Sequence, residues 1–260
     1  MYSALKIASK YAKYFLVGRS KYYLHSPFVY KLVSEVILDK KELPFSFQLE
    51  KIRKELLKDQ STMPWTELGS NKDKFDSKRS VSSIAKVAKN KKYASCLARI
   101  VKWHQPKVSI ELGTCIGLSA LYQNLSYTKG KFHTIEGAQS AFDLAKTNIK
   151  KFPESNIEQH LGNFDQAFPK ILNQYEEVDY IFFDGNHTKE ATLRYFHEAL
   201  PKANNNSLFV FDDIHYSKGM EEAWLEIQNH PEVTLTIDLF FIGLVFFRKE
   251  QAKEHFKIRF

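Results

Sequence analysis

Short hydrophobic runs and amphipathic stretches alternate from residue 108 to the end of the chain. An uninterrupted apolar run bounded by turn residues is typical of a strand that is buried on both faces of a sheet. Runs of this kind predict strands at 108–111, 132–135, 157–161, 178–183, 207–211, 233–239 and 242–247.

The stretches between these runs carry hydrophobic residues at the i, i+3, i+4 spacing of a helix. The clearest stripes are Leu118, Leu121, Tyr122 and Leu125; Ala138, Ala141, Phe142, Ala145 and Ile149; and Met220, Ala223, Trp224 and Ile227. Strands that alternate with helices predict an α/β fold with a mainly parallel sheet covered on both faces. Only residues 240–241 separate the last two strands, which is too short for a crossover, so we expect an antiparallel hairpin there.

The first 107 residues have a different pattern. Residues 1–58 are predicted to be helical, with Leu49, Ile52 and Leu56 on one helix face. Residues 60–80 show no hydrophobic period and are rich in Ser, Lys, Asp and Asn, which predicts a loop, a linker or a lid. A further helix is expected from about 81 to 103. We therefore expect a basic helical extension with its linker over residues 1–80, and one α/β domain over residues 81–260.

Charge is divided along the chain in a similar way. The whole chain carries 38 Lys and Arg against 30 Asp and Glu, a net charge of +8. Residues 1–107 carry a net charge of +14, and residues 108–260 a net charge of −6. A basic, acid-poor start can lie on a membrane surface, direct transit into an organelle or bind phosphates. The simplest interpretation is an amphipathic helix with a solvated basic face.

Composition excludes several classes of protein. Of the 260 residues 43% are hydrophobic, including 21 Phe and 13 Tyr, which is enough to build a core. Two cysteines exclude a disulfide scaffold and favour a reducing compartment. The longest apolar run, 239–247, is far shorter than the roughly 20 residues that span a bilayer. We expect a cytoplasmic protein without a transmembrane segment, and the sequence allows a homodimer.

A glycine turn follows the first predicted strand, in the segment SIELGTCIGLS at 109–119. Ligands of open α/β sheets bind at the carboxyl ends of the strands. A dinucleotide fingerprint needs glycine where Cys115 stands, and a phosphate loop needs a lysine directly after Gly117. The turn therefore favours a nucleoside-like ligand without phosphates, and the carboxylate of Glu111 favours an ammonium group.

Glu136 ends the second predicted strand, in the segment FHTIEG. An acid at this place accepts hydrogen bonds from ribose hydroxyls. Glu111 and Glu136 could each be an ordinary acid at a strand end, but the strand, the paired glycines and the following helix around Glu111 favour a binding site. The other E-L-G segment, at 67–69, has neither a strand before it nor a second glycine after it.

Three carboxylates close two predicted strands that should be neighbours. Asp184 follows YIFF, and Asp212 and Asp213 follow LFVF. Clustered carboxylates repel each other unless a cation lies among them, and hard oxygen ligands select Mg²⁺, Ca²⁺ or Mn²⁺ over zinc. A hydroxyl bound to such a cation has a lowered pKa and can react as an oxyanion. Alternatively, Asp184 is a turn residue and the acid pair caps the next segment.

The segments ELGTCIGLS, IEG, DYIFFDGNH and FVFDDIH together resemble the class I S-adenosylmethionine-dependent methyltransferases. Within that superfamily they are most similar to the cation-dependent O-methyltransferases of the catechol type and their sugar-modifying relatives. The resemblance covers about residues 80–250. It implies a Rossmann-like, mostly parallel sheet of seven strands that ends in an antiparallel hairpin. It also implies methyl transfer from S-adenosylmethionine to a hydroxyl of a small molecule.

The resemblance assigns roles to individual residues. It implies cofactor contacts from Glu111, Gly113, Gly117, Ser119, Glu136, Gly162, Asn163, Phe164 and Asp184. Among these, Ser119 would reach the carboxylate of the methionine part, Glu136 would hold the ribose, and Asn163 and Phe164 would lie beside the adenine. It implies a divalent cation, with Mg²⁺ expected first, on Asp184, Asp212 and Asp213. Asn163 could instead cap the following helix.

The general base departs from the family pattern. Catechol-type enzymes have a lysine three residues beyond the first metal acid, and this chain has His187 there. A neutral histidine can transfer a proton near pH 7, so His187 and Asp184 are the expected catalytic residues. His215 and Tyr216 could border the acceptor.

Two other functions stay open. An RNA-modifying methyltransferase could use the basic N-terminal part to bind phosphates, although the chain lacks an aromatic RNA-binding stripe and nucleic acid is not the expected partner. An interaction protein without enzymatic activity could dock its basic helix on a membrane or an acidic partner.

Overall fold

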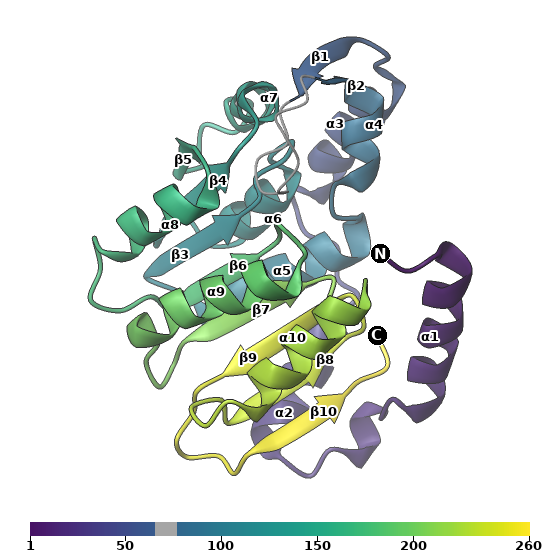
Figure 1. The fold of residues 1–260 in the computed structure, drawn as a ribbon, viewed down its shortest axis with the longest axis vertical. Helices are drawn as coiled ribbons and strands as arrows, with labels where there is room; N and C mark the ends of the chain where they lie inside the picture. The colour runs from purple at the N-terminus through teal and green to yellow at the C-terminus, as the bar shows by residue number, and fades with distance from the viewer. Residues whose placement is uncertain (66–76) are drawn as a thin grey trace. The chain divides into compact units, whose positions relative to one another are not determined.

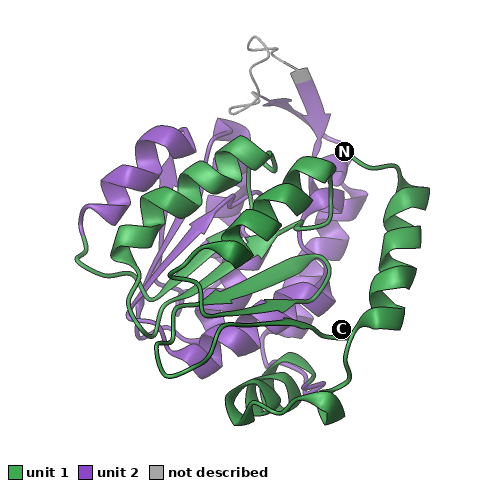
Figure 2. Ribbon diagram, turned by 60° about the horizontal axis from the view of Figure 1, so that its bottom comes forward, with its two compact units in different colours: residues 1–38, 175–260 green, residues 39–174 purple. Residues whose placement is uncertain are grey.

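The computed structural model describes residues 1–65 and 77–260. The chain forms two compact units, which Figure 2 shows in different colours: residues 1–38 with 175–260 (unit 1), and residues 39–174 (unit 2). This division does not coincide with the boundary expected at residue 80, because residues 1–38 pack with the C-terminal part of the chain and residue 80 lies inside unit 2. That residues 81–260 form a domain of their own stays a prediction.

Unit 2 contains a three-stranded parallel sheet in the order β3-β4-β5. Its elements, labelled in Figure 1, are α3 (Ser46–Lys58), β1 (Thr62–Trp65), β2 (Ser77–Ser80), α4 (Val81–Val87), α5 (Lys91–His104), β3 (Val108–Leu112), α6 (Leu118–Ser126), β4 (Lys131–Glu136), α7 (Gln139–Ile149), β5 (Ile157–Leu161) and α8 (Phe164–Leu172). A core of buried apolar side chains from α3, α4, α5 and α6 holds the helices of this unit together.

Unit 1 contains a mixed sheet in the order β10-β8-β9-β7-β6. Its elements are α1 (Ala4–Val17), a 3₁₀ turn (Lys21–Tyr23), α2 (Pro27–Leu32), a π-helical turn (Val33–Ile37), β6 (Tyr180–Phe183), α9 (Lys189–Ala199), a 3₁₀ turn (Leu200–Lys202), β7 (Leu208–Asp212), α10 (Lys218–Asn229), β8 (Leu235–Asp238), β9 (Ile242–Phe246) and β10 (Glu254–Lys257). Strands β6 and β7 are parallel, and β9 is antiparallel to both β7 and β8.

The predicted α/β, Rossmann-like class is confirmed. Every strand predicted from the apolar runs is present, as β3 to β9, and the expected C-terminal hairpin is β8 with β9. Helices separate β3, β4 and β5 in unit 2 and β6, β7 and β8 in unit 1. The residues of β6, β7, β8 and β9 are buried, as continuous apolar runs require.

Three local predictions were wrong. The seven-stranded count missed β10, which pairs in parallel with β8 although its residues are mostly exposed and polar. The flanks of the expected loop at 60–80 are strands, because β1 and β2 pair antiparallel. The helix expected at 81–103 is interrupted, since the side chain of Asn90 accepts a hydrogen bond from the backbone N–H of Tyr93 and starts α5 anew.

Residues 66–76 lie outside the described residues. They include the central part of the expected lid and the segment at 67–69. No helix in the described ranges 1–65 and 77–260 is both long enough and apolar enough to cross a bilayer.

Candidate functional site

The turn after β3 has the backbone geometry that its glycines allow. Gly113 and Gly117 adopt φ angles of +104° and +79°, which L residues with side chains rarely adopt. A Cβ atom on Gly117 would also lie 3.3 Å from the Cβ of Ala145 in α7. Between the glycines, Cys115 has a φ of +51°, an uncommon value for a residue with a side chain. The glycines therefore let the backbone turn into the start of α6, and the lack of a side chain at 117 lets this turn pack against α7.

Glu136, at the end of β4, is held against this turn. Its carboxylate accepts hydrogen bonds from the backbone N–H of Cys115 at 2.7 Å and from that of Ala138 at 2.9 Å. Burial raises the pKa of the Glu136 carboxyl, although these backbone donors act in the opposite direction. The side chain is 9% exposed. A fixed carboxylate at the end of β4 is the arrangement that the predicted ribose contact requires.

Glu111 is fully buried inside unit 2. Its carboxylate accepts a hydrogen bond from the hydroxyl of Thr134 at 2.8 Å and one from the amide of Gln123 at 2.9 Å. Burial raises the pKa of Glu111 to about 7, because the contacts with Thr134, Ser119 and Gln123 offset only part of the desolvation. Glu111 therefore joins β3, β4 and α6 beneath the turn, and its predicted ammonium contact stays a prediction.

Ser119 lies in the first turn of α6 and is 7% exposed. The first N–H groups of a helix lack partners within the helix, and they carry a partial positive charge. A carboxylate at this helix start would be stabilised, as the predicted contact with the methionine carboxylate of the cofactor requires.

The turn after β5 connects to the same strand as Glu136. The N–H of Gly162 donates to the backbone oxygen of Glu136 at 2.9 Å. The side chain of Asn163 accepts a hydrogen bond from the N–H of Asp165 at 2.9 Å and caps α8. The capping alternative for Asn163 is therefore present in the structure. The adenine contacts of Asn163 and Phe164 stay predictions.

The acids of unit 1 form a group with a histidine. Ligand atoms of Asp184, His187 and Asp212 all lie within 4.8 Å of one another, and His187 Nε2 is 3.7 Å from Asp184 Oδ1. Asp212 is 2% exposed, whereas Asp184 and His187 are partly exposed. Two carboxylates and an imidazole at this spacing fit one divalent cation. Asp213 does not join this group among the described residues, so its place in the metal set stays a prediction.

Both turns that carry these acids contain residues in the left-handed region. Asn186, between Asp184 and His187 in sequence, and Asp213 each have a φ of +53°. Asn and Asp tolerate this conformation better than other residues with side chains, at some cost in free energy. Backbone strain of this kind is concentrated at functional sites, and here it recurs where two parallel strands end.

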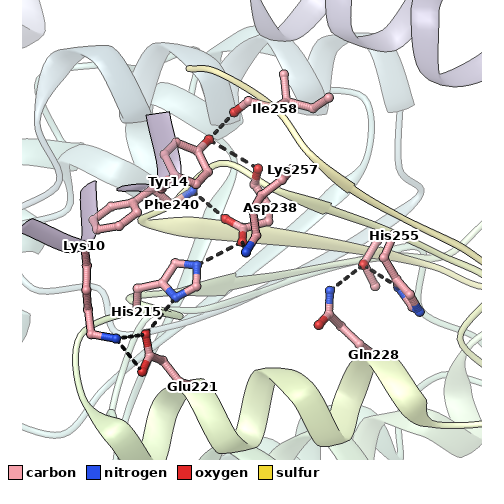
Figure 3. Close-up of polar contacts among 11 residues, drawn as sticks. Lys10, Tyr14, His215, Glu221, Gln228, Asp238, Phe240, His255, Lys257 and Ile258 are labelled. Atoms are coloured by element: carbon pink, nitrogen blue, oxygen red, sulfur yellow. Dashed lines mark hydrogen bonds and ion pairs between the residues drawn. The ribbon is translucent and has the colours of Figure 1, made fainter. Parts of the chain in front are cut away.

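The imidazole of His215 is held between two carboxylates, and its contact with an acceptor stays a prediction. Its ring bonds to Asp238 through Nε2 at 2.9 Å and to Glu221 through Nδ1 at 3.2 Å, as Figure 3 shows. Sequence reasoning missed Glu221 and Asp238, because they lie 6 and 23 residues away on α10 and β8 and form no motif. The ring centroid of Tyr216 lies 6.1 Å from that of His187, a member of the acidic group.

Comparison with known proteins agrees with this geometry. Residues 110–214 match a family model described as a methyltransferase domain. An O-methyltransferase from Bacillus cereus in complex with S-adenosylhomocysteine has 18% identity and a TM-score of 0.56, over 83% of this chain and 96% of that one.

Two further structures are similar over comparable lengths. TomG, an O-methyltransferase from Streptomyces achromogenes involved in tomaymycin synthesis and solved with S-adenosylmethionine, has 17% identity and a TM-score of 0.56, over 85% of this chain and 95% of that one. The S-adenosylhomocysteine-bound methyltransferase PaMTH1 from Podospora anserina has 13% identity and a TM-score of 0.55, over 81% of this chain and 100% of that one.

These matches define the class of protein. The chain has the fold of the class I methyltransferases, and its residues 110–214 are a methyltransferase domain. The match over residues 110–214 and the shared fold agree with the class of protein that the sequence motifs predicted.

Proposed function

We propose that this protein is an O-methyltransferase that methylates a hydroxyl of a small molecule with the help of a divalent cation. The group formed by Asp184, His187 and Asp212 carries this proposal. Two carboxylates and an imidazole suit cation binding and proton transfer at a hydroxyl, and they supply no nucleophile for methylation at carbon.

Glu136 and the glycine turn of unit 2 bind the cofactor in this proposal. S-adenosylmethionine, when bound, supplies an electrophilic methyl group on its sulfonium. The Glu136 carboxylate accepts hydrogen bonds from the ribose hydroxyls. The N–H groups of Cys115 and Ala138 already hold this carboxylate in place. The start of α6 at Ser119 receives the carboxylate of the methionine part. Glu111 positions α6 and β4, because it accepts hydrogen bonds from Gln123 of α6 and Thr134 of β4.

Asp184 and Asp212 hold the cation, and His187 takes the proton of the acceptor hydroxyl at its Nε2 atom. A divalent cation, when bound, lowers the pKa of a hydroxyl that contacts it. Oδ1 of Asp184 lies 3.7 Å from Nε2, so its negative charge would stabilise the imidazolium that forms when Nε2 takes the proton. Asp184 and Asp212 supply oxygen ligands alone, which suit the expected Mg²⁺.

A pair of conservative variants tests both halves of the proposal. Binding of S-adenosylhomocysteine is measured by calorimetry, and methyl transfer from labelled S-adenosylmethionine is measured with a set of catechols, phenols and sugars. We expect Glu136→Gln to weaken cofactor binding about 10-fold or more, because one charge-assisted pair of hydrogen bonds is lost. We expect Asp212→Asn to bind the cofactor normally and to lose transfer, and EDTA to abolish transfer by the unchanged protein.

Glu154→Gln is the matched control, because Glu154 is exposed and lies outside the site. It should bind and react like the unchanged protein. Equal cofactor affinity in Glu136→Gln and the unchanged protein would refute the ribose assignment. Full transfer activity in excess EDTA would refute the cation.

A further inference from the structure

A second group of ligating side chains lies in unit 2, on strands β4 and β5. It consists of His133, Glu158 and His160, which we call the histidine cluster. His133 lies directly opposite Glu158 in the parallel register, and His160 is two residues further along β5. Because side chains alternate between the two faces of a strand, all three lie on one face of this sheet.

The ligand atoms of the histidine cluster are close together. Nδ1 of His133 lies 3.0 Å from Nε2 of His160 and 3.5 Å from a carboxylate oxygen of Glu158. Nε2 of His160 is 3.5 Å from the other oxygen of Glu158. In a tetrahedral zinc site with ligands at about 2.0–2.2 Å, the ligand atoms are roughly 3.3–3.6 Å apart. The three side chains therefore already have nearly the spacing that one zinc ion needs.

The three side chains of the histidine cluster differ in their exposure to solvent. His133 is 1% exposed, whereas the side chains of His160 and Glu158 are 23% and 63% exposed. Ions can thus enter from the side of Glu158, and water can supply a fourth ligand there. Burial lowers the pKa of His133, although the charge of Glu158 acts against this, so His133 favours the neutral form that coordinates metals.

The chemistry of the donors selects the class of metal. Two imidazole nitrogens and one carboxylate oxygen suit Zn²⁺, whereas Mg²⁺ and Ca²⁺ prefer sites made of oxygen alone. This set also differs from the group in unit 1, which has one imidazole and two carboxylates.

We propose that His133, Glu158 and His160 bind one Zn²⁺ ion that links β4 to β5. Binding displaces the proton that lies between the two ring nitrogens, and the ring that carried it takes a proton on its other nitrogen, so that both ligands are neutral imidazoles. The ion stabilises unit 2, because it joins a buried strand to a strand whose residues are largely exposed or half-buried. The proposal is independent of the methyl-transfer chemistry, since none of its ligands is assigned to the cofactor or to the cation of unit 1.

The test is zinc titration of the full chain after removal of metals with EDTA and dialysis. Calorimetry gives the affinity and number of zinc ions, and the visible absorption of bound Co²⁺ reports a four-coordinate site with nitrogen ligands. We expect His160→Gln and Glu158→Gln each to weaken zinc binding at this site, by about 100-fold for the histidine, since loss of a ligand exceeds the 10- to 100-fold cost of an outer-shell change. Glu154→Gln is the control for Glu158→Gln.

Asp212→Asn separates this site from the acidic group of unit 1. It should keep the Co²⁺ absorption and the zinc site of the histidine cluster, even if one weaker zinc ion is lost. Glu158 is mostly exposed, so Glu158→Gln stays informative if His160→Gln fails to fold. Unchanged zinc affinity and Co²⁺ absorption in Glu158→Gln, or a Co²⁺ absorption lost in Asp212→Asn alone, would overturn the proposal. Cofactor binding by calorimetry is a separate readout, so failure of the zinc site leaves the methyltransferase proposal intact.

Discussion

Among single residues, Glu111 should make the stability of the fold depend on pH. It is fully buried and its pKa is raised to about 7 by burial. In the unfolded chain the same carboxyl titrates near 4.5. The unfolded state therefore loses its proton first as the pH rises, so the stability contributed by Glu111 is present below pH 4.5 and lost by pH 7.

Glu111→Gln should remove this pH dependence. We expect the free energy of unfolding of the unchanged protein, relative to that of the variant, to fall by roughly 2–3 kcal/mol between about pH 5 and pH 8, at about 1.36 kcal/mol per pKa unit. Urea denaturation of both proteins at the two pH values measures the difference, with Glu154→Gln as the exposed control. Parallel stability curves for Glu111→Gln and the unchanged protein would show that Glu111 is ionised in the fold throughout this range.

The sequence allowed the site residues in the turns to be recognised, but it did not show which side chains would lie beside them in the fold. Gly113, Gly117 and Glu136 were recognisable because a strand, a glycine turn and an acid at a strand end occur in a fixed order along the chain. Neither Glu111 as a buried acid nor His133 beside His160 was recognisable. Their environment depends on which strands become neighbours, and this pairing is set by packing across the whole sheet.

Among the secondary-structure elements, α10 packs closely on β9. The Trp224 ring lies over the backbone of Gly243, and a Cβ atom on that glycine would come within 2.5 Å of the ring. Both residues belong to buried parts of unit 1. Position 243 therefore requires glycine because any side chain there would collide with the Trp224 ring.

Gly243→Ala should destabilise unit 1 by about 1–3 kcal/mol, the usual cost of overpacking a core. Gly219→Ala in α10 is the matched control, since the added atom would meet its nearest neighbour at 3.4 Å, an ordinary contact. That control should be neutral or slightly stabilising, because alanine favours a helix more than glycine does. Chemical denaturation measures both, and a neutral Gly243→Ala would contradict this close packing of Trp224.

The strength of the hydrophobic pattern decided which elements could be predicted. Strands β3 to β9 were predictable because their residues form continuous apolar runs. Strand β10 was missed because only Phe256 of its residues is buried, and its polar residues give no hydrophobic signal. Strands β1 and β2 were missed because they are short and half-exposed, so backbone pairing rather than burial defines them.

Across the molecule as a whole, the basic N-terminal helix is part of unit 1. The Tyr14 hydroxyl donates to the backbone oxygens of Ile258 and Asp238, and Lys10 forms an ion pair with Glu221 at 2.8 Å, as Figure 3 shows. Tyr14 is 4% exposed. Segments from the two ends of the chain therefore pack together, which supports the interpretation of α1 as an amphipathic helix that packs on the protein.

Tyr14→Ala should release α1 and destabilise unit 1 by about 3–5 kcal/mol, the range for truncating a buried aromatic side chain. Amide hydrogen exchange should rise over residues 1–18 and over β10, because Tyr14 joins α1 to the strand segment that ends at Ile258. Tyr22→Ala is the control, since Tyr22 is 79% exposed and its loss should change stability by less than about 0.5 kcal/mol.

An N-terminal helix that serves to bind RNA phosphates would behave differently. Tyr14→Ala would then leave the stability unchanged, and RNA affinity would fall steeply with salt in the unchanged protein. Because the tyrosine is buried and its hydroxyl bonds to two backbone oxygens, we expect the stability to change and RNA binding to stay weak at all salt concentrations.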